Sequence, residues 1–108
     1  MNRERRAILN GILNQLSRCR TVGNISMKEL DDICNSLTSV SEDELESYQS
    51  LPDNLMMSDR AFNMLDNVGD IGEAVSLLTS IAEEVMTMRK LKIRLKKAME
   101  SINKVIVR

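Results

Sequence analysis

The side chains that could carry chemistry in this chain are carboxylates and two thiols. The sequence has no histidine, so the usual general base and the commonest metal ligand are absent. Cys19 and Cys34 cannot complete a four-ligand zinc site alone, and we interpret both as reduced core thiols. The sequence contains neither a glycine-rich phosphate loop nor a nucleophile elbow. It therefore predicts a protein that is not an enzyme and that holds no metal or cofactor.

The acidic residues favour a surface that binds a partner protein. Paired carboxylates can bind a divalent cation or act as acid and base, but neighbouring acids on one helix are usually solvated. Residues 21–88 contain two basic and fourteen acidic side chains, a net charge of −12. We predict that this block presents phosphate-like charge to a basic protein surface. The predicted acidic face consists of Asp31, Asp32, Glu42, Asp43, Glu44 and Glu46.

Basic residues gather at both ends of the sequence. Residues 1–20 carry five basic and one acidic side chain, net +4, and residues 89–108 carry eight and one, net +7. The second stretch fits three interpretations: a solvated helix face that pairs with the acidic block, a phosphate-binding face for nucleic acid, or a membrane-surface or calmodulin-target helix. Few aromatic side chains are available to stack on bases, which weighs against the second. The nucleic-acid alternative would use Arg89, Lys90, Lys92, Arg94, Lys96 and Lys97.

Apolar residues at three- and four-residue spacings predict that helices carry these charges. Two capping boxes, Ser26 with Glu29 and Ser41 with Glu44, indicate separate helix starts. Pro52 disfavours helical geometry at the residue before it and predicts an elbow, after which Ser58 can cap the next helix. The expected short helices cover about residues 5–19, 27–38 and 42–50.

From Ala61 onward the apolar stripe continues to the C-terminal end with a coiled-coil-like period. A three-residue step after Val85 shifts its phase. We predict one long helix from about 59 to 104, roughly 70 Å at 1.5 Å per residue, with a possible kink near Gly69 to Gly72. Three short helices cannot cover it, so a second copy of the chain is expected to do so, as a homo-oligomer.

The pattern as a whole predicts one elongated, all-α domain over residues 1–108. Short helices and the proline elbow occupy 1–57, and the long helix with its basic end occupies 58–108. The absence of an apolar run of about 20 residues and of a signal-peptide stretch predicts a cytoplasmic protein that does not contact membranes. Methionines can form a surface that adapts to a partner, and the elbow is the best candidate. Its predicted binding residues are Tyr48, Met56, Met57 and Arg60.

The stretch DELESYQSLPDNLMMSDRAFNML resembles the central motif of small helical proteins of unassigned function that bacteriophages and prophages encode. Those proteins carry an acidic helix, then Tyr or Phe, Leu-Pro, Leu, Ser and Arg, and then an acidic and aliphatic helix. The opening MNRERR is also similar. Residues 20–40 look like an insertion, and the basic segment after Met88 looks like an addition. The matching residues are Glu44, Glu46, Tyr48, Leu51, Pro52, Leu55, Ser58, Arg60 and Met64.

The resemblance implies a phage accessory role in a bacterial host cell and no named reaction. We therefore expect a non-catalytic protein that binds a host or phage protein and that inhibits a host enzyme or defence system. Two alternatives stay open. One is a nucleic-acid-binding module that uses the basic C-terminal helix, and the other is an oligomeric sponge for a small ligand with pockets between subunits.

Overall fold

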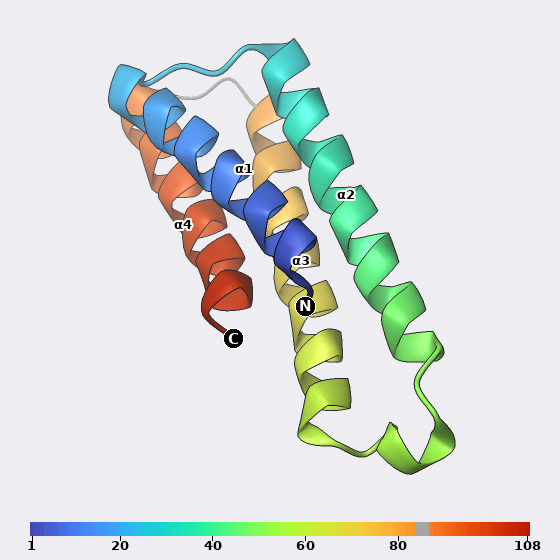
Figure 1. Ribbon diagram of the computed structural model, residues 1–108. Coiled ribbons are helices and arrows are strands. Elements are labelled where there is room, and N and C mark those ends of the chain that lie inside the picture. The colour runs from blue at the N-terminus through green and yellow to red at the C-terminus, as the bar shows by residue number, and fades with distance from the viewer. Residues whose placement is uncertain (84–86) are drawn as a thin grey trace.

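The protein is an elongated bundle of antiparallel helices in the computed structural model, which describes residues 1–83 and 87–108 (Figure 1). No strand occurs within these residues, which confirms the all-α prediction. The molecule measures 49 × 23 × 20 Å. In the described ranges, none of the helices is long and apolar enough to cross a membrane. The elements are α1 (Arg3–Val22), α2 (Met27–Gln49), the short 3-10 helix η1 (Asp53–Leu55), α3 (Asp59–Glu83) and α4 (Met88–Val107).

Helix α1 has a side-chain cap at its start and a glycine at its end. The Asn2 side chain accepts a hydrogen bond from the Arg5 amide at 2.8 Å. Gly23 adopts a left-handed conformation with φ 78°, and its amide donates to the Cys19 carbonyl at 2.7 Å. A Cβ at Gly23 would also lie 2.8 Å from the Met88 side chain, so both the backbone conformation and the available space favour glycine here. The helix buries one stripe, formed by Leu9, Ile12, Leu16 and Cys19.

Helix α2 begins where the first capping box predicts and then continues through the second. The Ser26 hydroxyl accepts from the Glu29 amide at 3.1 Å. The predicted helices 27–38 and 42–50 are wrong, because they form one helix that runs through Ser41. The stripe of buried residues continues at helical spacing across the expected break, so packing favours an unbroken helix over the local capping signal. That stripe consists of Leu30, Ile33, Leu37, Val40 and Glu44.

The elbow forms where Pro52 predicts it. Helix α2 ends at Gln49, and α3 begins at Asp59 with the Ser58 hydroxyl accepting from the Ala61 amide at 3.2 Å. The short helix η1 lies between them. The local chemistry of proline and serine is therefore sufficient to place this chain reversal.

The prediction of one long C-terminal helix is wrong. Helices α3 and α4 are two antiparallel helices that pack on each other (Figure 1). Thr87 caps α4, with its hydroxyl accepting from the Lys90 amide at 3.3 Å. The phase shift at Val85 lies outside the described residues. Helix α3 continues without interruption through Gly69 and Gly72, which both lie on its exposed side.

The fold-back of α4 removes the argument for a second copy. The apolar seam that was expected to need another chain is covered by the chain itself, since α3 packs against both α2 and α4, and α4 packs against α1. Its members have no measurable exposure. The buried seam includes Ile71, Ala74, Leu78, Leu95, Ala98, Ile102 and Val105.

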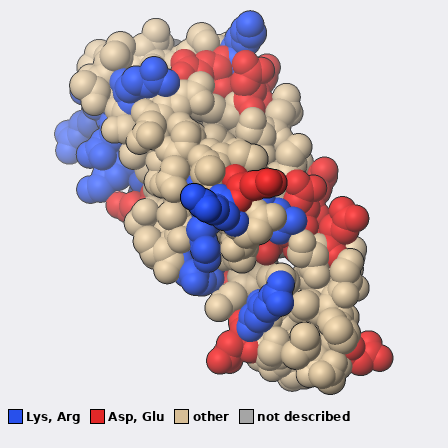
Figure 2. Space-filling model, in the orientation of Figure 1, with Lys and Arg blue, Asp and Glu red and all other residues tan. Residues whose placement is uncertain are grey.

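The same packing sorts the charges into two layers. The cationic layer, α1 and α4, holds twelve basic and two acidic side chains, a net charge of +10. The anionic layer, α2 and α3, holds two basic and twelve acidic side chains, a net charge of −10. In Figure 2 Lys and Arg lie mainly over the left and centre of the face in view, and Asp and Glu lie mainly along its right side. The charge blocks of the sequence thus become opposite sides of one bundle.

Candidate functional site

One end of the molecule is a hairpin that extends past the ends of α1 and α4 (Figure 1). We call residues 45–65 the elbow hairpin; they comprise the end of α2, η1 and the start of α3. On its α3 side, Ala61 and Met64 are buried. The hairpin projects from one end of the bundle (Figure 1).

Large apolar side chains are exposed on this hairpin. Met57 is 80% exposed and Phe62 is 45% exposed. Such side chains in one short region are typical of a binding surface, because water favours their burial. In Figure 2 most of the corresponding lobe is uncharged, with basic side-chain atoms on the face in view and carboxylates at its margins. The exposed apolar residues of the hairpin are Leu45, Leu55, Met57, Phe62 and Leu65.

The predicted elbow residues divide by exposure. Met57 and Arg60 are exposed, whereas Tyr48 and Met56 are half-buried. Leu55, near the tip of the hairpin, is exposed as well.

The predicted acidic face is spread along α2. Asp31 and Asp32 lie near its start and are about 16 Å, at 1.5 Å per residue, from the exposed group near its end. The exposed group is Glu42, Asp43 and Glu46. Glu44 does not belong to this face, since its side chain has no exposed surface. Its place at helical spacing after Val40 puts it on the inner stripe of α2.

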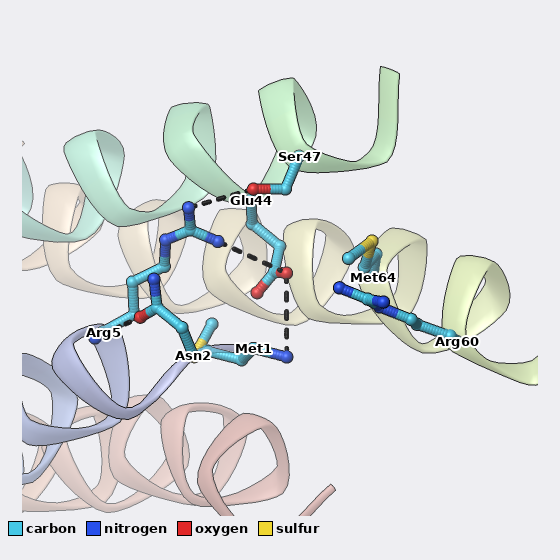
Figure 3. A pocket seen from close by; sticks show the side chains of 7 residues that line it. All are labelled: Met1, Asn2, Arg5, Glu44, Ser47, Arg60 and Met64. Atoms are coloured by element: carbon cyan, nitrogen blue, oxygen red, sulfur yellow. Dashed lines mark hydrogen bonds and ion pairs between the residues drawn. The ribbon is translucent and has the colours of Figure 1, made fainter. Parts of the chain in front are cut away.

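Glu44 is the centre of a buried polar network at the base of the hairpin (Figure 3). Its Oε1 lies 3.7 Å from Arg5 Nη1 and 3.8 Å from the Met1 amino nitrogen. Its Oε2 accepts a hydrogen bond from Asn67 Nδ2 at 3.4 Å. Oε1 itself has no hydrogen-bond partner among the described residues. One buried carboxylate oxygen is therefore held by charge alone.

The network continues toward the C-terminal end of α4. Asn67 Oδ1 accepts from Arg108 Nη1 at 3.2 Å, and the same nitrogen lies 2.7 Å from Asp70 Oδ2. On the other side, Arg5 Nη2 donates to Ser47 Oγ at 3.0 Å. Arg5 in α1 and Arg108 directly after α4 each form an ion pair with a carboxylate of the anionic layer.

Beside Glu44 lies a cavity of about 440 Å³, which we call the Glu44 cavity. In Figure 3 Arg60 extends along it toward the Glu44 carboxylate. Glu44 and Arg60 belong to the phage-like motif, but their meeting with Arg5 depends on how α1 packs and leaves no local signal. The lining residues are Met1, Asn2, Arg5, Glu44, Ser47, Arg60 and Met64.

Most residues of the nucleic-acid alternative lie on the outer face of α4. Arg89, Lys90, Lys96 and Lys97 are exposed and Lys92 is half-buried. Arg94 differs, because its guanidinium donates to the Ser80 hydroxyl at 2.8 Å and the Ser80 carbonyl at 3.2 Å and so ties α4 to α3.

Helix α1 adds a basic residue to this surface. Arg20 and Lys96 line one groove of about 290 Å³ between α1 and α4, together with Leu13, Met99, Glu100 and Asn103. Of the five basic residues in the block 1–20, Arg20 is the one that lines this groove.

The two cysteines are free thiols in the helical core. Burial raises the pKa of Cys19, and the neighbouring Glu29 carboxylate raises it further. Burial also raises the pKa of Cys34, although a hydrogen bond with Thr79 opposes the change. Both favour the neutral thiol, which is the less reactive form.

In the part of the chain that the structure describes, no three His, Cys, Asp or Glu side chains approach one another closely enough to hold a metal ion. Comparison of the chain with models of known protein families, with curated proteins and with solved structures found no match. The elbow hairpin and the Glu44 cavity are therefore assigned from their own geometry.

Proposed function

We propose that the protein is a non-catalytic, phage-type accessory protein that acts by binding another protein in the bacterial cytoplasm. Its partner is a host or phage protein, and the consequence is inhibition of a host enzyme or defence system. The phage-like motif supports the setting, and its Leu-Pro-Asp turn falls within the elbow hairpin. The hairpin is the docking element.

The observation that carries this proposal is the exposed apolar surface of the hairpin. Anchor residues at protein interfaces are typically large apolar or aromatic side chains near the centre of the contact. Met57 and Phe62 have this character, and at 80% and 45% exposure neither belongs to the buried core. Contact of these apolar side chains with water is unfavourable, and a partner that covered them would remove this contact.

Charge around the hairpin indicates the chemistry of the partner. Carboxylates flank the apolar residues in the sequence, and Arg60 is the one basic residue between positions 42 and 66. A complementary partner carries an apolar patch with lysines and arginines at its rim. The surrounding acidic residues are Glu42, Asp43, Glu46, Asp53, Asp59 and Asp66.

The test is capture from a bacterial lysate by the immobilised full chain, followed by titration of the purified partner. Met57→Ser combined with Phe62→Ser should weaken binding by about tenfold or more. Val22→Ser with Met27→Ser is the matched control, because these side chains are 70% and 57% exposed at the opposite end of the bundle. Equal capture by the hairpin variant and the wild type would contradict the proposal.

A second candidate function is nucleic-acid binding by the cationic layer. The observation in its favour is the groove in which Arg20 and Lys96 meet. Phosphate contacts from such a face give binding that strengthens steeply as salt falls. Truncation at Met88 cannot test this, because α4 supplies core residues such as Leu95 and Ile102. A mobility-shift assay should instead compare the wild type with Arg20→Gln and Lys96→Gln; an unchanged salt dependence would reject the candidate.

We propose a homo-oligomer on the ground of charge, and no longer on the ground of an uncovered apolar seam. The cationic layer of one copy is complementary to the anionic layer of another, so association should weaken with added salt. Sedimentation velocity at low and high ionic strength measures this. A single sedimenting species of unchanged mass at both salt concentrations and at high protein concentration would contradict it.

A further inference from the structure

The Glu44 cavity combines an anion and cations in a way that the docking role of the hairpin does not use. We propose that it binds a protonated phosphoryl group, either inorganic phosphate or the phosphate of a small phosphomonoester. In this arrangement a P–OH group donates to Glu44 Oε1, while the charged phosphate oxygens accept from Arg60 and Arg5. The site lies within one chain, unlike the intersubunit pockets of the sponge hypothesis.

The first element of the site is the buried carboxylate. Glu44 has no exposed side-chain surface, and its Oε1 lacks a hydrogen-bond donor among the described residues. Its two cationic neighbours lie at 3.7 and 3.8 Å, too far for a hydrogen bond. A buried acceptor of this kind is normally satisfied, so a ligand that offers an O–H or N–H would complete it.

The second element is the excess of positive charge. The guanidinium groups of Arg5 and Arg60 line the cavity, and Glu44 is the one carboxylate that does so. Arg60 forms no hydrogen bond or ion pair with any described residue. It extends toward Glu44 in Figure 3 and can supply a planar pair of donors to an oxyanion.

Helix α1 adds to this potential from its N-terminal end. Asn2, the residue that caps it, lines the cavity. The amide dipoles of a 20-residue helix place partial positive charge at that end, where anions are stabilised. The cavity as a whole therefore favours a negatively charged ligand.

The combination selects among anions. Sulfate carries no proton at neutral pH, so its oxygens would face Glu44 Oε1 without a hydrogen bond and with charge repulsion. Hydrogen phosphate has the same shape and keeps one O–H, which can donate to that oxygen. The volume of about 440 Å³ falls within the size range of small-molecule sites and leaves room for a small organic group on the phosphate.

The test is calorimetric titration of the full chain with inorganic phosphate and with sulfate at pH 7. Phosphate should bind about tenfold or more tightly than sulfate. Arg60→Gln should weaken phosphate binding by a similar factor, whereas Arg18→Gln, the same change at an exposed site on the other end of α1, should have no effect. No binding of phosphate, equal binding of the two anions, or an Arg60→Gln variant that binds like wild type would each overturn the proposal.

Glu44→Gln tests the role assigned to the carboxylate. An amide can donate to either anion, so the preference for phosphate over sulfate should shrink toward unity. An undiminished preference in a variant with a native circular-dichroism spectrum would overturn the proposal. Because Arg60 is exposed, the Arg60→Gln arm remains decisive even where the Glu44 variant does not fold.

Titration with glycerol phosphate distinguishes the two sources of the phosphoryl group. A monoester loses its last proton near pH 6, so its binding should be detectable at pH 5.5 and weaken by about tenfold per pH unit above its pKa. Inorganic phosphate keeps a proton at pH 8 and should still bind. Glycerol phosphate that bound equally at pH 5.5 and pH 8 would contradict the donated hydrogen bond. The Met57 and Phe62 variant should bind phosphate normally, so this proposal and the docking proposal fail separately.

Discussion

The cationic layer and the anionic layer share one hydrophobic core but carry opposite charge. Helices α1 and α4 hold a net +10, and α2 and α3 hold a net −10. Within each layer the like charges repel, which weakens the folded state. Across the layers the ion pairs of Arg5 with Glu44 and Arg108 with Asp70 lie at the end near the hairpin. The shared core therefore provides the stability, while the like charges within each layer oppose it.

The largest effects should come from the shared core. Leu37→Ala in the anionic layer and Leu95→Ala in the cationic layer should each lower the free energy of unfolding by about 2–5 kcal/mol. Both side chains are fully buried. Ile93→Ala is the control, because Ile93 is 45% exposed on α4. Urea denaturation measures all three, and a mild effect of either leucine variant would show that the layers do not share a core.

The next effect concerns the link between the layers. Arg5→Gln removes the guanidinium that faces buried Glu44 Oε1 at 3.7 Å and should lower the free energy of unfolding by about 1–3 kcal/mol. Arg3→Gln, an exposed change on the same helix, should alter it by less than about 0.5 kcal/mol. Similar unfolding midpoints for the two variants would mean that Arg5 contributes no specific contact.

A smaller effect should appear at the start of α4. Arg89 and Lys90 lie in its first turn, where no acidic residue is present and where positive charge opposes the helix dipole. Lys90→Glu should therefore stabilise the protein by about 0.3–1 kcal/mol. Lys104→Glu in the last turn should destabilise it by a similar amount. Thermal denaturation measures both variants. A change in stability of the same sign for both would contradict the view that positive charge at the start of α4 lowers the stability of the protein.

The smallest effect is confined to alkaline pH and compares one thiol from each layer. The pKa of Cys19 in α1 and of Cys34 in α2 is raised above the ordinary value of 9.0, in both mainly by burial. Because folding favours the neutral thiol, the contribution is complete at pH values below the unfolded pKa and is lost as the pH rises through the folded pKa. Stability should thus decline above about pH 9.

Replacement of both thiols tests this decline. The double variant Cys19→Ala, Cys34→Ala should show a shallower loss of stability between pH 9 and pH 10.5 than the wild type, measured by urea midpoints. Parallel curves for the two proteins would show that neither thiol is linked to folding in this range.

Local signals predicted much of the helical layout. Ser26, Pro52 and Ser58 act within a few residues of their own position, and the structure places helix boundaries at all three. The capping box of Ser41 and Glu44 wrongly predicted a helix start, because the same spacing also occurs inside helices. The burial of Glu44 against α1 favours the continuous helix over a separate helix start. Capping chemistry is therefore informative where packing does not oppose it.

The fold-back and the Glu44 cavity depend on contacts between distant residues. The apolar stripes of α3 and α4 have the same helical spacing, so this spacing alone predicts one continuous helix. Thr87, which caps α4, was the local signal for the break. The cavity joins Arg5, Glu44 and Arg60 from three helices, and a single sequence does not specify which helices become neighbours.

The fold-back that creates the two layers can be tested most directly by one distance. Spin labels at Asp59→Cys and Lys104→Cys, in a protein with Ser at both native cysteines, report the separation of the start of α3 from the end of α4. The account predicts a distance below the 49 Å length of the molecule, unchanged on dilution with unlabelled protein. A continuous helix would place these positions about 68 Å apart at 1.5 Å per residue, and that result would contradict the account.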